Sequence, residues 1–293
     1  MKRIILNIQY ITNISIKYTG MIFALLGFIG MFVPLSDIFR DGTSLINKIV
    51  SSLCVLLGTW LLVFAVSCVY VYLKKYYQIL DVGNGRHVYV QYGDIFSCNR
   101  GKVIKERNII IPVNRCFDTI IDDDLISRRT LHGITMNKLY ANHIYTQEEL
   151  NEKIQTVLAN NKSKYKNISV KNKRKGNLKR YEVGTVAEIQ GEEGVTYFFL
   201  ALTQFDQDLH ASTGDDEYVL ALIKMLMYNN KRSQGRPLFV PLIGAGAANT
   251  QKEERDILEY LVKLIKMNKK IINCDLHIVI RDTAKDSISI TNL

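Results

Sequence analysis

The sequence of 293 residues is poor in proline and glycine, with 4 Pro and 18 Gly, and has only five cysteines, none of them in a C-x-x-C pair. The low proline and glycine content excludes collagen-like and linker-like chains. The sparse cysteines exclude a disulfide framework and a zinc ribbon, and they are typical of a reducing cytosol. With 47% hydrophobic residues the chain is not intrinsically disordered either, because disordered chains carry few apolar residues.

Charged residues are also missing from two long apolar runs, residues 18–35 and residues 49–73. As helices these runs would extend for ~27 Å and ~37 Å, enough to cross the hydrocarbon core of a bilayer. The core helix of a soluble protein is one alternative, but such helices seldom stay wholly apolar beyond ~14 residues. A cleaved signal peptide would end in a small-x-small site, which the first run lacks. We therefore expect two transmembrane helices.

The net charge is +10, and part of the basic excess predicts how the chain crosses the membrane. Basic residues precede the first run and follow the second, as Lys2, Arg3 and Lys17, and as Lys74 and Lys75. Because basic residues stay on the cytoplasmic side, we expect residues 1–17 and 79–293 in the cytoplasm and residues 36–48 outside. The segment before the first run would either lie on the membrane surface or extend the first helix.

Small residues recur at helical spacing on both predicted membrane helices. The first series is Gly20, Ala24, Gly27 and Met31, and the second is Ser51, Cys54, Gly58, Leu61, Ala65 and Cys68. Small side chains let helix backbones approach closely in lipid. The two series therefore predict either packing of the two-helix hairpin or association of several copies.

Residues 79–293 alternate between predicted strands and predicted helices. The strands are expected at residues 88–96, 107–114, 180–189, 195–203, 237–244 and 274–280, and the helices at 147–161, 216–230 and 251–269. Two helices begin with a capping box, Thr146 with Glu149 and Thr250 with Glu253. Several strands are uniformly apolar, which is typical of a sheet covered on both faces. The predicted fold class is α/β: a transmembrane hairpin followed by a three-layer α/β/α domain with a mixed sheet.

Residues 162–180 carry nine Lys or Arg residues and no acidic residue. Such a run could bind nucleic acid or anionic lipid. Tyr165 is its only aromatic residue, however, which leaves base stacking unsupported. We therefore predict a mobile, solvated loop and no nucleic-acid partner, with a membrane-facing role as the alternative.

Three predicted strands end in loops of polar or small residues. The first loop contains Gly93-Asp94-Ile95, the second covers residues 112–127 and the third covers residues 241–250. The third runs from a buried strand through glycine and alanine into a helix N-terminus, a geometry that suits a diphosphate. It matches neither a Walker A loop nor a dinucleotide fingerprint, and tight turns need glycine in any case.

Together these loops resemble the macro domain, an α/β fold that binds ADP-ribose. The run VNRCFDTIIDDDLIS at residues 113–127, followed by Leu131-His132-Gly133, is similar to the divergent macro domain of membrane effectors in type II Thoeris antiphage systems. The strand and loop at residues 200–206 fit the same subfamily, as does the order of two membrane spans followed by the domain. The resemblance covers nearly the whole chain.

The resemblance implies a binding site for an ADP-ribose derivative, with no catalytic residue, no metal and no other cofactor. It places Asp94 against the adenine amino group and Ile95 in the base pocket. It implies backbone N–H bonds to the diphosphate from Gly244, Ala245, Gly246 and Ala247. It assigns to the distal ribose and its substituent Asn114, Phe117, Asp118 and Thr119. Further candidates, since a carboxylate would favour a cationic group there, are Asp122, Asp123 and His132.

The resemblance also implies a sensor in the bacterial inner membrane. A TIR-domain partner would consume NAD and make the signal, histidine-ADP-ribose in this branch. Its binding would drive homo-oligomerisation of the transmembrane helices in the lipid bilayer, and membrane disruption would end in abortive infection.

The rival interpretation is a membrane-anchored hydrolase of ADP-ribose conjugates. Hydrolytic macro domains carry an Asn-Ala-Ala-Asn stretch and a Gly-Gly-Gly run. This chain has Asn114-Arg115-Cys116-Phe117 at the corresponding place and no such glycine run. Cys116 is expected to be a small buried thiol rather than a nucleophile, and we predict that the chain is not an enzyme.

Overall fold

The computed structural model describes residues 2–33, 38–39, 42–97, 106–192, 194–244, 253–291 and 293. The chain divides into two compact units. One comprises Met1–Lys75 with Lys285–Asn292, and the other comprises Tyr76–Ala284.

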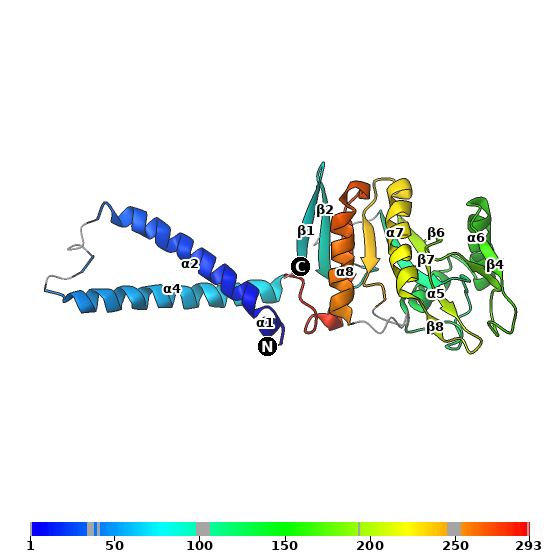
Figure 1. The fold of residues 1–293 in the computed structure, drawn as a ribbon, viewed down its shortest axis with the longest axis horizontal. Helices are drawn as coiled ribbons and strands as arrows, with labels where there is room; N and C mark the ends of the chain where they lie inside the picture. Colours follow the sequence, from blue (N-terminus) through cyan, green and yellow to red (C-terminus); the bar gives the residue numbers. More distant parts are fainter. Residues whose placement is uncertain are drawn as a thin grey trace. The chain divides into compact units, whose positions relative to one another are not determined.

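Among the described residues of the first unit are the helices α1 (Lys2–Leu6), α2 (Ile8–Gly30) and α4 (Leu45–Leu73) (Figure 1). Helices α2 and α4 are long and apolar enough to cross a membrane. Both are largely exposed, so neither is a core helix of this chain. Since α2 already begins at Ile8, most of the segment before the first apolar run extends the first helix.

The buried residues of α2 and α4 do not coincide with the glycines of the small-residue series. They are Ile11, Ser15 and Thr19 on α2, and Ser67 and Val71 on α4. Gly20, Gly27 and Gly58 are exposed, and a Cβ at any of them would meet nothing within 4 Å. The described hairpin therefore does not pack through these glycines.

The C-terminal residues complete the first unit. The side-chain oxygen Oδ1 of the buried Asn7 accepts hydrogen bonds from the hydroxyls of Ser289 and Thr291, each at 2.6 Å. Ile288 and Ile290 are almost fully buried. The tail is thus attached to the turn between α1 and α2.

The second unit contains an eight-stranded mixed sheet in the part of the chain that the structure describes, with the order β1-β2-β10-β9-β3-β7-β6 and β8 paired with β7. The central strands β2, β10, β9, β3 and β7 are parallel, and β1, β6 and β8 pair antiparallel with their neighbours. The strands are β1 (Tyr76–Gly83), β2 (Arg86–Tyr92), β3 (Arg107–Asn114), β6 (Val186–Gln190), β7 (Val195–Phe205), β8 (Ala211–Ser212), β9 (Leu238–Pro241) and β10 (Leu276–Ile280).

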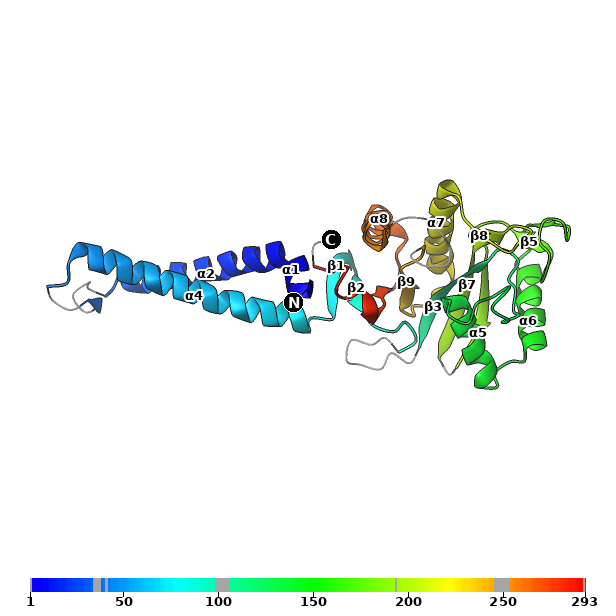
Figure 2. The same ribbon diagram turned by 90° about the horizontal axis from the view of Figure 1, so that it is seen from below.

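Helices cover both faces of this sheet (Figure 2). On one face lie α7 (Asp215–Arg232) and α8 (Glu254–Met267), and on the other lie α5 (Leu131–Ala141) and α6 (Gln147–Asn160). Ile109 and Ile111 of β3 belong to a buried cluster that also contains Met136 of α5 and Ile154 of α6. This arrangement confirms the predicted three-layer α/β/α domain.

Most of the predicted elements are present. Strand β3 has the predicted bounds, and α6 begins with the predicted capping box, in which Thr146 and Glu149 exchange hydrogen bonds of 2.7 and 3.2 Å. Strands β1 and β8 and helix α5 were not predicted. The second capping box, Thr250 with Glu253, lies partly outside the described residues.

Residues 162–180 are the clearest correction. They contain an antiparallel pair of strands, β4 (Tyr165–Asn167) and β5 (Lys179–Tyr181), and the side chain of Lys173 between them is fully buried. The prediction of a solvated loop is wrong for Lys173, because its ammonium pairs with Asp118 more than fifty residues earlier in the chain, whereas most other residues of the segment are exposed. The predicted strand at residues 180–189 is accordingly divided between β5 and β6.

We predict that the second unit loses stability as the pH falls from about 6.5 to about 4. Burial of His132 in α5 lowers its pKa from 6.5 to about 4, so between these values the unfolded chain binds a proton that the folded chain does not. A shift of this size corresponds to at most ~3 kcal/mol. Urea unfolding of the full chain in detergent at pH 7 and pH 4.5 measures the loss.

The variant His132→Asn should lose less stability between these two pH values than the wild type. His210→Asn is the matched control because the His210 side chain is 80% exposed. An equal pH dependence in the wild type and His132→Asn would contradict the prediction.

Candidate functional site

A cavity of about 840 Å³ lies at the carboxyl ends of the parallel strands. Its lining includes Asp94 after β2, Asn114 at the end of β3, Gly244 after β9 and Arg281 after β10. Since these four strands are neighbours in the sheet, their carboxyl ends meet at one edge, where open α/β sheets bind ligands. Loops that are far apart in the sequence thus converge on one site.

Asp94 and Ile95 form the part of the cavity next to β2. The Asp94 carboxylate accepts a hydrogen bond from the Phe96 N–H at 3.1 Å and another from the Ser97 hydroxyl at 3.1 Å. Its side chain is otherwise exposed, whereas Ile95 is buried and belongs to the main apolar cluster. The turn therefore presents an oriented carboxylate beside an apolar surface.

Asn114 presents an unused donor to the cavity. Its side-chain oxygen accepts the backbone N–H of Cys116 at 3.0 Å and that of Asp118 at 3.5 Å. Its Nδ2 is buried and has no hydrogen-bond partner among the described residues. A buried donor without a partner is costly, and a ligand acceptor in the cavity would satisfy it.

Phe117, Asp118 and Thr119, which the resemblance assigns to the distal ribose, do not line the cavity. Phe117 has a left-handed backbone with φ of 50° and packs edge-on against Tyr181, with ring centroids 5.5 Å apart. Asp118 is buried in an ion pair, and the Thr119 carbonyl accepts the Tyr140 hydroxyl at 2.8 Å. The three residues support the turn after β3 from behind.

Cys116 also lies outside the cavity lining. It is buried, and burial raises the pKa of its thiol. A nucleophilic cysteine needs a lowered pKa and access to the substrate. The predicted role as a small buried thiol is confirmed.

The wall opposite the strand ends is formed by residues 123–127 and 129–132. Asp123 lies on it with a left-handed φ of 63°, and its carboxylate accepts the Arg128 N–H at 2.8 Å. His132 also lines the cavity, and its Nε2 is buried without a partner among the described residues. Asp122 does not line the cavity; its carboxylate accepts the backbone N–H of Leu125 at 2.8 Å.

The Leu131-His132-Gly133 motif at the end of this wall requires a glycine at position 133 for steric reasons. A Cβ at Gly133 would lie 2.2 Å from the carbonyl oxygen of Ser127, a distance that only glycine permits. The first turn of α5 is therefore pressed against the end of the wall. This close approach places His132 at the cavity.

Four apolar residues of the cavity wall were not predicted to belong to the site. They are Leu125, Ile126, Phe205 and Leu209, which form a small cluster of their own beside the cavity. Arg281 and Glu254, an ion pair in the cavity lining, were also missed. Arg281 could have been found from its position directly after a predicted strand, whereas the apolar cluster joins segments that share no local pattern.

Of the predicted glycine-rich loop, Gly244 lines the cavity. Ala245, Gly246 and Ala247 lie outside the described residues. The hydroxyl of Tyr218, in the first turn of α7, donates to the Ile243 carbonyl at 2.8 Å and so holds the chain that enters this loop. Within the described ranges no group of three His, Cys, Asp or Glu side chains is arranged to hold a metal ion.

Similar proteins share this domain. The chain is 28% identical over 163 residues to the Thoeris protein ThsA of Bacillus amyloliquefaciens (strain Y2), a match that covers 56% of this chain and 50% of the relative. The chain thus spans about half the length of the curated relative that it matches.

Solved structures with a similar fold include two of the Oceanobacillus iheyensis macrodomain. The one with MES bound has 11% identity and a TM-score of 0.47, covering 72% of this chain and 90% of that chain. The one with ADP has 10% identity and a TM-score of 0.45, covering 73% and 92%.

A family match covers most of the region that forms the cavity. Residues 88–281 match the family described as Thoeris protein ThsA, Macro domain. This range begins in β2 and ends directly after β10, so it contains all four strand ends that line the cavity. The chain therefore belongs to the ThsA macro domain family.

Proposed function

We propose that this chain is a membrane-anchored sensor that binds an ADP-ribose derivative in the cavity at the strand ends. The observation that carries the proposal is the order of groups along the cavity: the Asp94 carboxylate with Ile95, then Gly244, then the free donor of Asn114. An ADP-ribose molecule offers an adenine, a diphosphate and a ribose in that order. Membership of the ThsA macro domain family supports the same ligand class.

The cavity has a suitable size and polarity for such a ligand. Its volume of about 840 Å³ falls within the range of ~300–1,000 Å³ that is usual for small-molecule sites. A carboxylate has about four lone-pair positions, so Asp94 can accept the adenine amino group while it keeps its bonds to Phe96 and Ser97. In this proposal the backbone at Gly244 approaches the diphosphate, together with Ala245, Gly246 and Ala247.

The cavity wall formed by Asn114 and residues 123–127 and 129–132, the distal wall, suits a ligand that carries a further polar group. Asn114 Nδ2 and His132 Nε2 are both buried without partners, and Asp123 adds a carboxylate. With its pKa lowered to about 4 by burial, His132 is neutral at physiological pH and can pair with a neutral or a cationic group. These residues support histidine-ADP-ribose as the signal, made by a TIR-domain partner that consumes NAD.

Binding without turnover is favoured over hydrolysis. Cys116 is outside the cavity, and Asn114 uses its oxygen to hold its own turn. Asp118, the carboxylate closest to Asn114 in sequence, is held in a buried ion pair. The hydrolase interpretation is the rival that product analysis must exclude.

The helical unit would carry the response. We propose that α2 and α4 cross the bacterial inner membrane with both termini in the cytoplasm. The exposed Gly20, Gly27 and Gly58 would allow helices of several copies to approach closely in lipid. Ligand binding would favour this association, and the resulting membrane damage would stop phage production in the infected cell.

Calorimetry of the full chain in detergent with ADP-ribose and with histidine-ADP-ribose tests the binding step. We expect submicromolar dissociation constants for the better ligand and its recovery unchanged after incubation. Release of free histidine or another product would support the hydrolase instead. Absence of binding to both ligands would exclude the sensor.

The variant Asp94→Asn should weaken ADP-ribose binding about tenfold or more, since a hydrogen bond to a charged acceptor contributes ~1.5–3 kcal/mol. Asp81→Asn is the matched control, because Asp81 also accepts the backbone N–H two residues further on, at 2.8 Å, but lies in β1 outside the cavity lining. Equal affinities of the two variants would contradict the role of Asp94.

Dye release from vesicles that contain the full chain tests the membrane step. The ligand should cause release, and Gly58→Leu should reduce it without changing the dissociation constant, because a large side chain keeps helices apart. Val55→Leu, at another exposed position of α4, should release dye like the wild type. Ligand-independent release, or no release with saturating ligand, would contradict this part of the proposal.

A further inference from the structure

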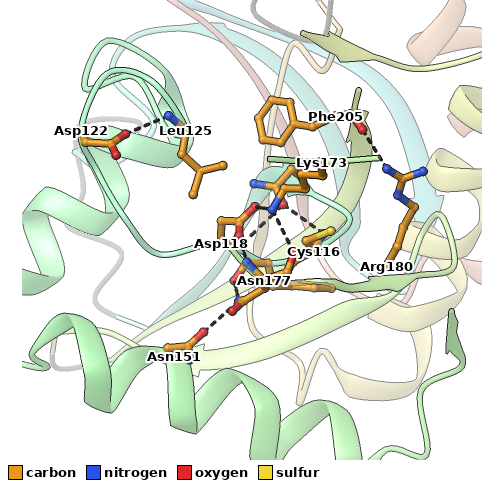
Figure 3. A network of polar contacts seen from close by, with 11 residues as sticks. Cys116, Asp118, Asp122, Leu125, Asn151, Lys173, Asn177, Arg180 and Phe205 are labelled. Carbon is orange, nitrogen blue, oxygen red and sulfur yellow. Dashed lines mark hydrogen bonds and ion pairs between the residues drawn. The ribbon is translucent and has the colours of Figure 1, made fainter. Parts of the chain in front are cut away.

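Residues 162–180, the basic segment, lie against the turn that follows β3. The Nζ atom of Lys173 is 2.7 Å from Asp118 Oδ2 and donates to the Asn177 carbonyl at 2.9 Å. The side chains of Lys173 and Asp118 are 0% and 1% exposed. Figure 3 shows this pair between the cavity turn and the basic segment. A charge pair so completely removed from water has to be held by precise geometry.

Asn177 joins the same turn through its backbone and its side chain. Its N–H donates to Asp118 Oδ1 at 2.6 Å. Its side-chain Nδ2 lies 3.3 Å from the carbonyl of Cys116, 3.2 Å from that of Phe117 and 2.9 Å from Asn151 Oδ1. The carbonyls on both sides of the left-handed Phe117 are therefore fixed by one residue of the basic segment.

Two further cations reach the next part of the cavity wall. Arg174 pairs with Asp124, and Lys175 pairs with Asp122 and lies 3.7 Å from Asp124. These carboxylates lie just before Leu125, an apolar residue of the cavity wall. Gly176 approaches the turn so closely that a Cβ there would lie 2.3 Å from Asp118 Oδ1.

We propose that the basic segment braces the distal wall of the ligand cavity, with Lys173 as a positioning residue that acts through Asp118 on Asn114. The Asp118 N–H and the Cys116 N–H both donate to Asn114 Oδ1, so the position of the turn sets where Asn114 Nδ2 points. Lys173 itself is not in the cavity lining. The proposal rests on the proposed function for the identity of the ligand, but the bracing of residues 114–127 does not depend on it.

The first test compares Lys173→Met with Lys171→Met, an exposed lysine of the same segment. Calorimetry of the full chain in detergent uses ADP-ribose and AMP, which lacks the distal ribose. Lys173→Met should bind ADP-ribose at least tenfold more weakly while its affinity for AMP changes less than twofold, and Lys171→Met should resemble the wild type. Unchanged ADP-ribose binding by Lys173→Met, or an equal loss for both ligands, would overturn the positioning role.

The second test disturbs the same contact without leaving a charge buried. Gly176→Ala pushes a Cβ against Asp118, and Gly235→Ala is its control, because both glycines have left-handed backbones (φ of 82° and 73°) but Gly235 has nothing within 4 Å of an added Cβ. We expect the selective loss of ADP-ribose affinity in Gly176→Ala alone. Equal ADP-ribose affinities of the two variants would overturn the proposal.

Hydrogen exchange separates this proposal from the proposed function. Without ligand, backbone amides of residues 114–127 should exchange at least tenfold faster in Lys173→Met than in Lys171→Met, with little change in β3 and β7. Unchanged exchange in residues 114–127 would overturn the brace. Failure of the wild type to bind ADP-ribose or histidine-ADP-ribose would instead exclude the proposed function, and the exchange result would still decide whether the segment braces the turn.

Discussion

Four neighbouring parallel strands, β2, β10, β9 and β3, end at the same edge of the sheet, and the cavity depends on this constraint. Each strand contributes one loop, and the loops bring an aspartate, a glycine, an arginine and an asparagine together from positions between 94 and 281. In the cavity, Asp94, Arg281 and Asn114 lie at or just after the last residue of their strands. Such a site forms only when the strands have this order, because the order brings the four loops together.

Within the described residues, the turn after β3 differs from the other three loops because charged and aromatic groups are buried around it. The Asp118 carboxylate and the left-handed Phe117 of this turn are buried close to the cavity, together with Lys173 of the basic segment. Breaking a buried ion pair by removing one partner typically costs ~3–5 kcal/mol, so the turn and the basic segment cannot order independently. Burial raises the pKa of Asp118, and the Lys173 ammonium opposes that effect. The ionised pair therefore depends on both segments being in place.

Local patterns were sufficient for much of the fold. Strand β3 is a continuous apolar run, and α6 begins with the capping box of Thr146 and Glu149. Helix α5 was missed because its buried face mixes His132, Gly133 and Thr135 with two apolar residues, so no apolar stripe marks it. Asp94, Ile95, Asn114, Asp123, His132 and Gly244 could be proposed from motifs and do line the cavity. The pairing of Lys173 with Asp118 spans more than fifty residues, and no local pattern contains it.

In the sequence the basic segment follows α6 and ends within β5, before β6. It is therefore an insertion relative to the central parallel strands. It contacts the cavity wall and the turn behind it through ion pairs with Asp118, Asp122 and Asp124, and through a hydrogen bond from Arg180 to the Phe205 carbonyl at 2.7 Å. Substitutions in residues 162–180 can therefore shift the distal wall without disturbing any central strand. If the cavity binds the proposed ligand, sequence divergence confined to this insertion would let related chains recognise different terminal groups without any change in the proposed adenine and diphosphate sites.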